Sequence, residues 1–265
     1  MKVDILGIKI DKIGIAEAVQ SVEQWVGDKD KHYIVTPNIE FVAVAQNDPS
    51  FKEILNRADL AIPDSSRFGW AQDLIQEKNS FKKILKWPFF IFPKAPLLMA
   101  FETVTGTDLM YKLISEAADK GFTVGFLGGK NQVADRLAKA LIEKYPKLKI
   151  TYVNGEVRVD NNGDVIVDPR DDGLEIPKTD VLFVAFGQVK QEKWIAKNLK
   201  KYPVKVMMGV GGAFDYLSGE VPRAPQIVRN LGFEWLFRLM IQPWRIRRFG
   251  SLLQFIWQIL AARSL

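Results

Sequence analysis

The sequence predicts an α/β fold, in which a mostly parallel sheet is flanked by helices, followed by a C-terminal helical appendage. Short β-branched or aromatic runs alternate with helical patterns along most of the chain. Residues 233–265 instead show amphipathic helical patterns rich in arginine and tryptophan. At 265 residues, the chain is long enough for one α/β domain, expected over residues 1–232, with a separate appendage over residues 233–265.

The expected strands, in chain order, are 33–36, 60–63, 123–127, 149–153, 181–186 and 204–210. Helices are expected at 40–46, 67–76, 107–120, 132–145 and 190–202, each after a strand end or a polar cap. Most of the strands are apolar enough to lie inside a Rossmann-like sheet that is covered on both faces. In such sheets ligands bind beyond the carboxyl ends of the strands. The residues that follow the strands are therefore the first site candidates: Asn38, Asp64, Gly128, Gly187 and Gly211.

The composition excludes several classes of site. The chain has no cysteine and a single histidine, His32, which excludes disulfides, thiolate metal sites, cysteine nucleophiles and centres built from several histidines. Acidic residues interrupt the apolar stretch at the N-terminus, which is therefore not typical of a secretory signal. We expect a cytoplasmic protein.

The net charge of +6 is concentrated in the C-terminal part of the chain. Residues 221–265 hold seven arginines and one acid, Glu234, whereas the remaining residues are balanced. Arginines interspersed with tryptophans suit phosphate groups on a ligand, a nucleic acid or an anionic membrane. The neutral remainder and the absence of a nucleic-acid motif disfavour the nucleic-acid interpretation, so no nucleic-acid partner is expected.

Two segments are unusually apolar. Residues 82–101 are aromatic and are interrupted by three prolines, which would break a helix, so this apolar insertion is too broken to span a bilayer. It could be a buried loop or an interfacial membrane contact. Residues 234–265 predict amphipathic helices interrupted near Pro243 and Gly250. They suit a helix lying in the membrane interface or, alternatively, a helix docked on its own domain or a second subunit.

Polar side chains follow the first two inner strands. Thr36 and Asn38 flank Pro37, which favours an extended exit from the strand, and either could line a site or simply cap the next helix. Asp64 ends the second strand and could serve as a general base. It could equally be the N-cap of the helix expected at 67–76.

Glycines follow the strand at 123–127. Gly128 and Gly129 let backbone amides approach a phosphate at a helix N-terminus. Their spacing matches neither the dinucleotide nor the ATP motif, which leaves a pyrimidine nucleotide possible. An Asp-x-Asp motif for a divalent ion occurs only at residues 28–30, in a lysine-rich turn typical of a solvated charge run. We therefore expect no metal, no cofactor, and arginines as the counterions of a diphosphate.

Seven ordered motifs together resemble the WecG/TagA/CpsF family, glycosyltransferase family 26. They are TPN at 36–38, Asp64, VTGTDL at 104–109, FLGGK at 126–130, KQEKW at 190–194, GVGGAFDYLSGEVPRAP at 209–225 and FEWLFRL at 233–239. The match runs from about Lys2 to Arg248. The resemblance implies a metal-independent, inverting enzyme that moves N-acetylmannosamine, or its uronic acid, from UDP to undecaprenyl-diphosphate-linked N-acetylglucosamine. It also implies a role in teichoic acid or surface polysaccharide synthesis, at the cytoplasmic face of the membrane.

The resemblance further assigns roles to residues. Asp64 is expected as the general base, with Thr36 beside it to position a substrate. The pattern RLxxxPWRIRR places three arginines where the family brings arginines to the active site to hold the diphosphate: Arg238, Arg245 and Arg248. The substrate-binding residues it implies are Asn38, Gln191, Gly211, Gly212 and Asp215.

The chain departs from the family pattern at three places. Ser65 and Arg67 follow the expected base where the family usually has DGxGV, residues 82–101 look inserted, and an apolar helix continues past Arg248. The first departure bears on donor or acceptor choice, and the other two on membrane contact. The change after the expected base also leaves open an alternative function. The protein could be a non-catalytic regulator that binds a nucleotide or a polyprenyl phosphate on the same fold.

Overall fold

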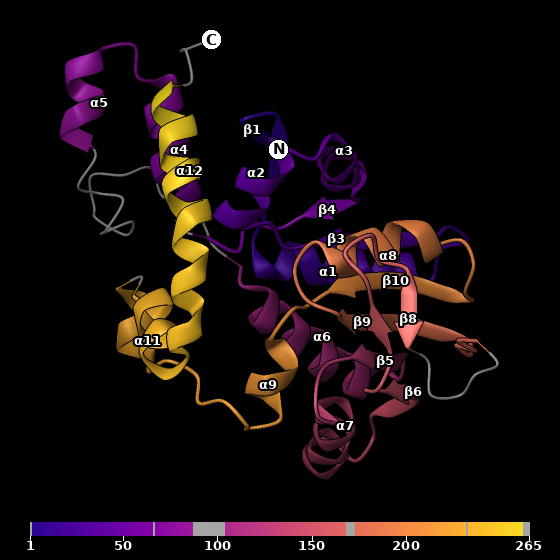
Figure 1. Cartoon of the computed structure of the whole chain (residues 1–265). Coiled ribbons are helices and arrows are strands. Elements are labelled where there is room, and N and C mark those ends of the chain that lie inside the picture. The colour runs from indigo at the N-terminus through magenta and orange to yellow at the C-terminus, as the bar shows by residue number, and fades with distance from the viewer. Residues whose placement is uncertain (1, 66, 87–103, 168–172, 232, 262–265) are drawn as a thin grey trace.

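The computed structural model describes residues 2–65, 67–86, 104–167, 173–231 and 233–261 (Figure 1). Its strands are β1 (Lys2–Ile5), β2 (Ile8–Asp11), β3 (His32–Val35), β4 (Leu60–Ala61), β5 (Thr123–Gly128), β6 (Lys149–Asn154), β7 (Arg158–Val159), β8 (Val165–Val167), β9 (Thr179–Ala185) and β10 (Val204–Gly209). Its helices are α1 (Ile15–Val26), α2 (Ile39–Ala45), α3 (Pro49–Arg57), α4 (Arg67–Gln76), α5 (Ser80–Lys86), α6 (Gly106–Lys120), α7 (Val133–Lys144), α8 (Lys190–Asn198), α9 (Ala213–Leu217), α10 (Gln226–Asn230), α11 (Glu234–Ile241), the 3-10 helix η2 (Pro243–Arg248) and α12 (Phe249–Ala261).

The six strands of the central sheet run in the order β4-β3-β10-β9-β5-β6. Each pairing described between them is parallel, which confirms the predicted sheet. Strand β4, which follows β3 in the chain, lies on one side of β3, and β10, the last strand of the sheet, lies on its other side. This reversal opens a crevice at the carboxyl ends of the strands, where α/β sheets bind their ligands.

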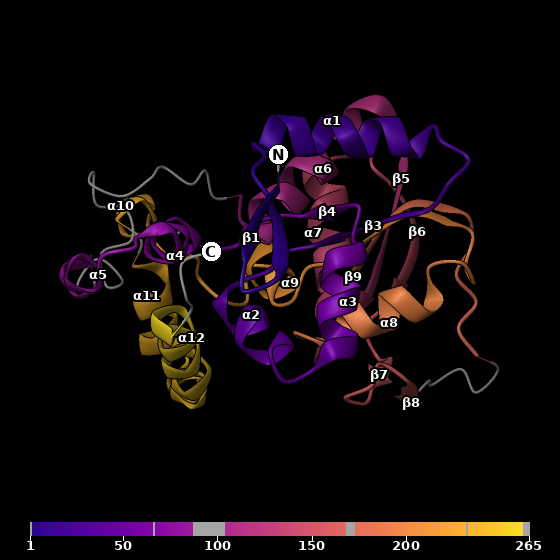
Figure 2. The same ribbon diagram turned by 90° about the horizontal axis from the view of Figure 1, so that it is seen from above.

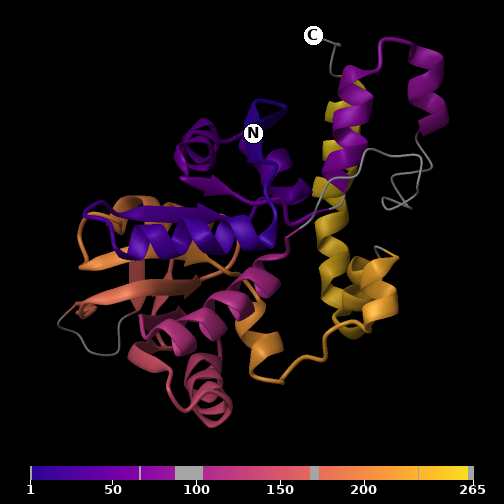
Figure 3. The same ribbon diagram turned by 180° about the vertical axis from the view of Figure 1, so that it is seen from behind.

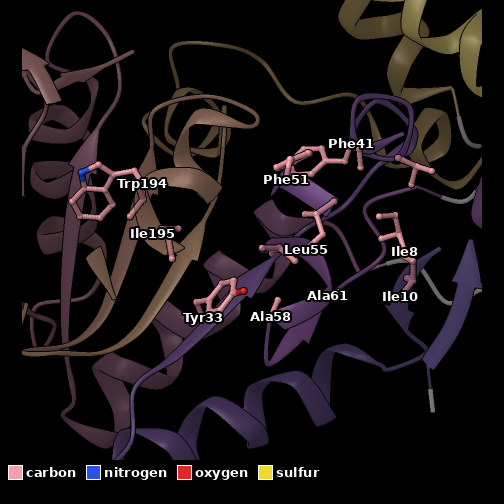
Figure 4. Packing of buried hydrophobic residues seen from close by; sticks show 14 of the residues in the cluster. Ile8, Ile10, Tyr33, Phe41, Phe51, Leu55, Ala58, Ala61, Trp194 and Ile195 are labelled. Carbon is pink, nitrogen blue, oxygen red and sulfur yellow. The ribbon is translucent and has the colours of Figure 1, made fainter. Parts of the chain in front are cut away.

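The inner strands are apolar on both faces because helices cover both. In β9, Leu182 and Val184 belong to one buried cluster, while Val181 and Phe183 belong to the other. Alternate side chains of a strand point to opposite faces, so a continuous apolar run is what a doubly covered sheet requires. Helices α1, α6, α7 and α9 supply one cluster, and α2, α3, α4, α8 and α12 contribute to the other. Figure 2 shows α1 and α6 on one side of the sheet and α2, α3 and α8 on the opposite side. Figure 4 shows part of the second cluster, with Tyr33 of β3 near α3 and α8.

The predicted helices are confirmed in place, with one error at a helix end. The helix expected at 190–202 ends at Asn198, whose carbonyl accepts a turn hydrogen bond from Lys201. The break expected near Gly250 is confirmed, because η2 ends at Arg248 and α12 begins at Phe249. The break at Pro243 is confirmed, because α11 ends at Ile241 and η2 begins at the proline.

The C-terminal helices α11, η2 and α12 stand beside the α/β layers (Figures 1 and 3). Helix α12 packs on α2 and α4 through three buried side chains, Phe255, Ile256 and Ile259. No helix among the described residues combines the length and the apolar character needed to cross a bilayer. Of the apolar insertion, residues 82–86 lie in α5, and the rest falls outside the described residues.

Candidate active site

A cavity of about 490 Å³ lies at the carboxyl edge of the sheet, between the strand ends, the start of α6 and the C-terminal helices. Nine of the residues selected from the sequence line it: Thr36, Asn38, Asp64, Gly187, Gln191, Gly211, Gly212, Arg238 and Arg245. They come from the ends of β3, β4, β9 and β10, from α8, and from two of the C-terminal helices. The topology therefore brings together groups that are more than 200 residues apart in the chain.

The other selected residues lie elsewhere. Gly128 and Gly129 have φ of +88° and +96°, a conformation that favours glycine, at the end of β5 and away from the lining of the cavity. Asp215 lies on α9 and does not line the cavity, although Gly212 and Tyr216 do. The side chain of Arg248 lies outside the described part of the structure. The Asp-x-Asp motif at 28–30 lies in a turn after α1 and does not reach the cavity.

Asp64 sits where β4 ends, held by the backbone. Its N–H donates to the carbonyl of Pro37 at 2.9 Å, which ties the ends of β3 and β4 together. Its Oδ1 accepts from the backbone N–H of Gly106 at 3.3 Å, at the first turn of α6. At the start of α4 it is Ser65 Oγ that accepts from the Arg67 N–H, at 3.3 Å. The hydrogen bond described for Asp64 thus leads to α6 and not to the helix that follows it.

Burial raises the pKa of the Asp64 carboxyl to about 7, against the lowering effect of the Arg238 charge. The charges of Glu234 and Asp108 act in the same direction as burial, and the hydrogen bond from Gly106 opposes them. A carboxyl with a pKa near 7 is present in both protonation states at neutral pH, as a general base requires.

Thr36 and Asn38 are fixed on either side of Pro37. Thr36 is buried, donates to the Gly209 carbonyl at 3.5 Å, and faces Gly106, where a Cβ would lie 3.1 Å from the threonine Cγ2. Asn38 caps α2, because its Oδ1 accepts from the N–H groups of Glu40 and Phe41. Capping and cavity lining are therefore combined in Asn38, and only its amide nitrogen is left to serve a ligand.

Gln191 is held by a buried carboxylate that the sequence interpretation missed, Glu192. Glu192 Oε1 accepts from Gln191 Nε2 at 2.7 Å, and its Oε2 accepts from the Val189 N–H at 2.8 Å. Gln191 Oε1 in turn accepts from the Gly211 N–H at 3.0 Å. The network joins the turn after β9 to the turn after β10, and burial raises the pKa of Glu192 to about 7.

Val189 shows that this turn is strained. Its φ is +70°, a region that β-branched residues avoid and that persists only when the surroundings enforce it. The hydrogen bond to Glu192 is one such constraint. Gly209 packs closely against the same network, because a Cβ there would lie 2.6 Å from Glu192 Oε1 and 2.7 Å from Gln191 Nε2.

Arg238 reaches the cavity from α11. Its Nη2 and Nε donate to Glu234 Oε1 at 2.6 and 3.1 Å, and its guanidinium lies 4.7 Å from the centre of the Tyr216 ring. The opposing effect of burial is outweighed by the charges of Glu234, Tyr216 and Asp64, so the pKa of Arg238 is raised and the group stays charged. A fixed cation thus lies near the Asp64 carboxyl.

Three further arginines line the cavity: Arg67, Arg223 and Arg229. The Arg67 guanidinium lies 5.4 Å from the centre of the Trp235 ring, and Arg223 Nη1 donates to Asp108 at 2.6 Å. Arg223 lies in the motif at 209–225 and Arg229 in the arginine-rich C-terminal part, so these signals were present in the sequence. What the sequence did not show is that they face the same cavity as Asp64.

A base and several cations in one cavity can remove a proton from a hydroxyl and neutralise a departing phosphate. This arrangement can be compared with known proteins. The model of the "Glycosyl transferase WecG/TagA/CpsF family" matches residues 3–85 and 98–265. The match omits residues 86–97, which lie within the expected insertion at 82–101.

Curated relatives also match this chain over nearly its whole length. A protein from Staphylococcus aureus strain MRSA252 is 28% identical over 264 residues, which is 99% of this chain and 93% of the relative. A protein from strain MW2 is 27% identical over the same shares of the two chains. Both are named N-acetylglucosaminyldiphosphoundecaprenol N-acetyl-beta-D-mannosaminyltransferase. With nearly its whole length matched by the family model, the chain belongs to the WecG/TagA/CpsF family of glycosyl transferases.

Proposed function

We propose that the protein moves N-acetylmannosamine, or its uronic acid, from a UDP donor to N-acetylglucosamine carried on undecaprenyl diphosphate. The reaction serves the synthesis of teichoic acid or another surface polysaccharide. The single observation that carries the proposal is the Asp64 carboxyl, with a pKa of about 7, in a cavity that also holds Arg238 and Arg245. Family membership and the names of the relatives supply the class of substrate.

In the proposed reaction Asp64 takes the proton of the acceptor hydroxyl. The hydroxyl oxygen bonds to the anomeric carbon while the bond from that carbon to the diphosphate oxygen breaks, and UDP leaves with the electron pair. A single displacement inverts the configuration at the anomeric carbon. Arg238 and Arg245 stabilise the charge on the departing diphosphate, so the reaction uses neither a metal ion nor a cofactor.

The C-terminal helices suit a place on the membrane surface. Met240, Trp244 and Trp257 are 74%, 65% and 70% exposed. The first two lie on α11 and η2, whose Arg238 and Arg245 line the cavity, and Trp257 lies on α12. Apolar and tryptophan side chains beside arginine are typical of segments that lie in the membrane interface. A lipid-linked acceptor is held in the membrane, so an enzyme that uses it must reach the membrane surface. We therefore propose that the protein is a peripheral protein at the cytoplasmic face of the membrane.

A donor screen tests the proposal. The purified chain is incubated with UDP-N-acetylmannosamine, its uronic acid, UDP-N-acetylglucosamine or UDP-glucose and a short-chain lipid-diphosphate N-acetylglucosamine. UDP release and the mass of the lipid product are then measured. We expect a disaccharide product with one of the first two donors. Binding of UDP without product from any donor would instead favour a non-catalytic regulator.

A further inference from the structure

Four of the arginines that line the cavity fall into two groups, according to whether they act on α9 or on the start of α6. Arg245 lies near enough to α9 for its charge to affect Asp215 there. Burial and the charge of Glu220 raise the pKa of Asp215, and the charges of Arg245 and Lys130 oppose that rise. Arg238 lies against Tyr216, also on α9. These two arginines therefore belong to the side of the cavity that the strand-end glycines Gly211 and Gly212 form.

Arg223 and Arg229 act instead on the start of α6. Asp108 is half-buried, and its partial burial would raise its pKa, but hydrogen bonds from Arg223 and Thr105 and the charges of Arg223 and Arg229 hold that pKa below its usual value. Asp108 lies two residues beyond Gly106, whose N–H binds Asp64. Arg223 is thus anchored less than one helical turn from the residue that holds the base.

Helix α10 joins this side of the cavity to an apolar surface. Arg229 and Gln226 line the cavity, whereas Ile227 and Leu231 are 73% and 55% exposed. Residues three or four apart share one face of a helix, so α10 turns polar side chains toward the cavity and apolar ones toward the surface. A ligand held by Arg229 would have an apolar surface beside it for a hydrocarbon chain.

We propose that Arg223 and Arg229 bind the diphosphate of the lipid-linked acceptor, with α10 beside the first part of its hydrocarbon chain. The inference rests on the proposed function, in which donor and acceptor each carry a diphosphate. In an inverting displacement the attacking and departing oxygens lie on opposite sides of the anomeric carbon. A cationic group beside α9 and another at the start of α6, where Gly106 holds the base, fit this requirement, and Arg238 and Arg245 are then left for the donor.

The experiment separates the two diphosphates. Arg229→Ala and the wild-type protein are compared with two acceptors, N-acetylglucosamine on a short-chain prenyl diphosphate and the same sugar as a simple alkyl glycoside. We expect Arg229→Ala to raise KM for the diphosphate acceptor at least about tenfold, as loss of a charge-assisted hydrogen bond does. KM for the donor, and the rate with the alkyl glycoside, should stay within about twofold. Arg57→Ala, which removes an exposed arginine of α3 paired with Glu53, is the matched control and should change neither constant.

The same variants are tested for binding, so that the result does not depend on turnover. Titration with a short-chain prenyl diphosphate, followed by tryptophan fluorescence, should give a Kd at least about tenfold weaker for Arg229→Ala, with UDP binding unchanged. An equal loss with both acceptors, or a rise in donor KM alone, would overturn the assignment. If the wild-type protein binds the lipid diphosphate through Arg229 but transfers no sugar, the binding site stands and the proposed function fails.

Discussion

The Asp64 carboxyl accepts a hydrogen bond from the backbone N–H of Gly106, with 3.3 Å between Oδ1 and the nitrogen. Gly106 is the first residue of the fifteen-residue helix α6, and the N-terminus of a helix stabilises negative charge. Burial disfavours that charge more strongly than Arg238 and this hydrogen bond favour it, and the outcome is a pKa of about 7. A carboxyl with such a pKa is usable as a base at neutral pH.

The first prediction concerns the stability of Asp64→Asn. The pKa of Asp64 rises from 3.8 in the unfolded chain to about 7 in the folded one. Between these values the folded state binds more protons, so the group destabilises the fold increasingly as pH rises and keeps that full effect above pH 7. Asparagine removes the effect. The Tm difference between Asp64→Asn and wild type, measured by differential scanning fluorimetry, should grow by a few degrees from pH 4 to pH 8. A difference that does not change with pH would contradict the raised pKa.

The second prediction concerns Glu192→Gln. Both oxygens of Glu192 accept hydrogen bonds, from Gln191 and Val189, whereas glutamine has one acceptor oxygen and an NH₂ group that would face a donor. We expect kcat/KM to fall about tenfold or more. Since a buried carboxyl with a raised pKa is removed, Tm at pH 8 should not fall with it. The control is Glu143→Gln on the exposed face of α7. A parallel loss of Tm and activity would make Glu192 a purely structural residue.

The third prediction compares two glycines. Gly209→Ala introduces a Cβ 2.6 Å from Glu192 Oε1, which must displace the Gln191 network and lower both Tm and transfer. Gly250→Ala is the matched control, because a Cβ there meets nothing within 4 Å and alanine favours a helix interior by about 1 kcal/mol. Its Tm should rise slightly with activity unchanged. Thermal unfolding and initial rates check both, and a silent Gly209→Ala would refute the close packing.

The fourth prediction concerns Arg238→Ala. The arginine lowers the pKa of Asp64 and, as proposed, stabilises the departing diphosphate. Its loss should reduce kcat by about 10²- to 10³-fold and move the pH dependence of kcat to higher pH. The exposed Arg57→Ala serves as the control for charge removal. If kcat fell with no shift in its pH dependence, Arg238 would not act on Asp64.

The sequence predicted the parallel sheet because six apolar strands and their helices have clear periods and ends. Strand-end positions then selected Asp64, Asn38, Gly187 and Gly211, since the carboxyl ends of parallel strands share one edge. The resemblance added Gln191 and the arginines. The same reasoning failed for Gly128 and Gly129, which lie at the end of an inner strand, β5, but do not line the cavity.

The remaining features depend on contacts between distant segments. The hydrogen-bond partners of Glu192 are local, Gln191 and Val189, but the hydrogen bond that links Gln191 to Gly211 spans twenty residues. The pairing of Arg223 with Asp108 spans 115 residues. The contact between Asp64 and the start of α6 could not be predicted from the sequence either. A role of Asp64 as the N-cap of the helix at 67–76 was an equal alternative, and the hydrogen bond from Gly106 distinguishes the two. Side-chain partners at such separations follow from the packed fold and not from a motif.

The most direct test of the account is the pH dependence of sugar transfer by wild type and Asp64→Asn, followed by the mass of the lipid product. The account predicts that wild-type kcat falls below an apparent pKa near 7. It predicts that Asp64→Asn loses about 10²- to 10⁴-fold in kcat at pH 8, the usual worth of base catalysis, while binding UDP as tightly as wild type. Transfer by Asp64→Asn at close to the wild-type rate would contradict the account, because Asp64 could then not be the base.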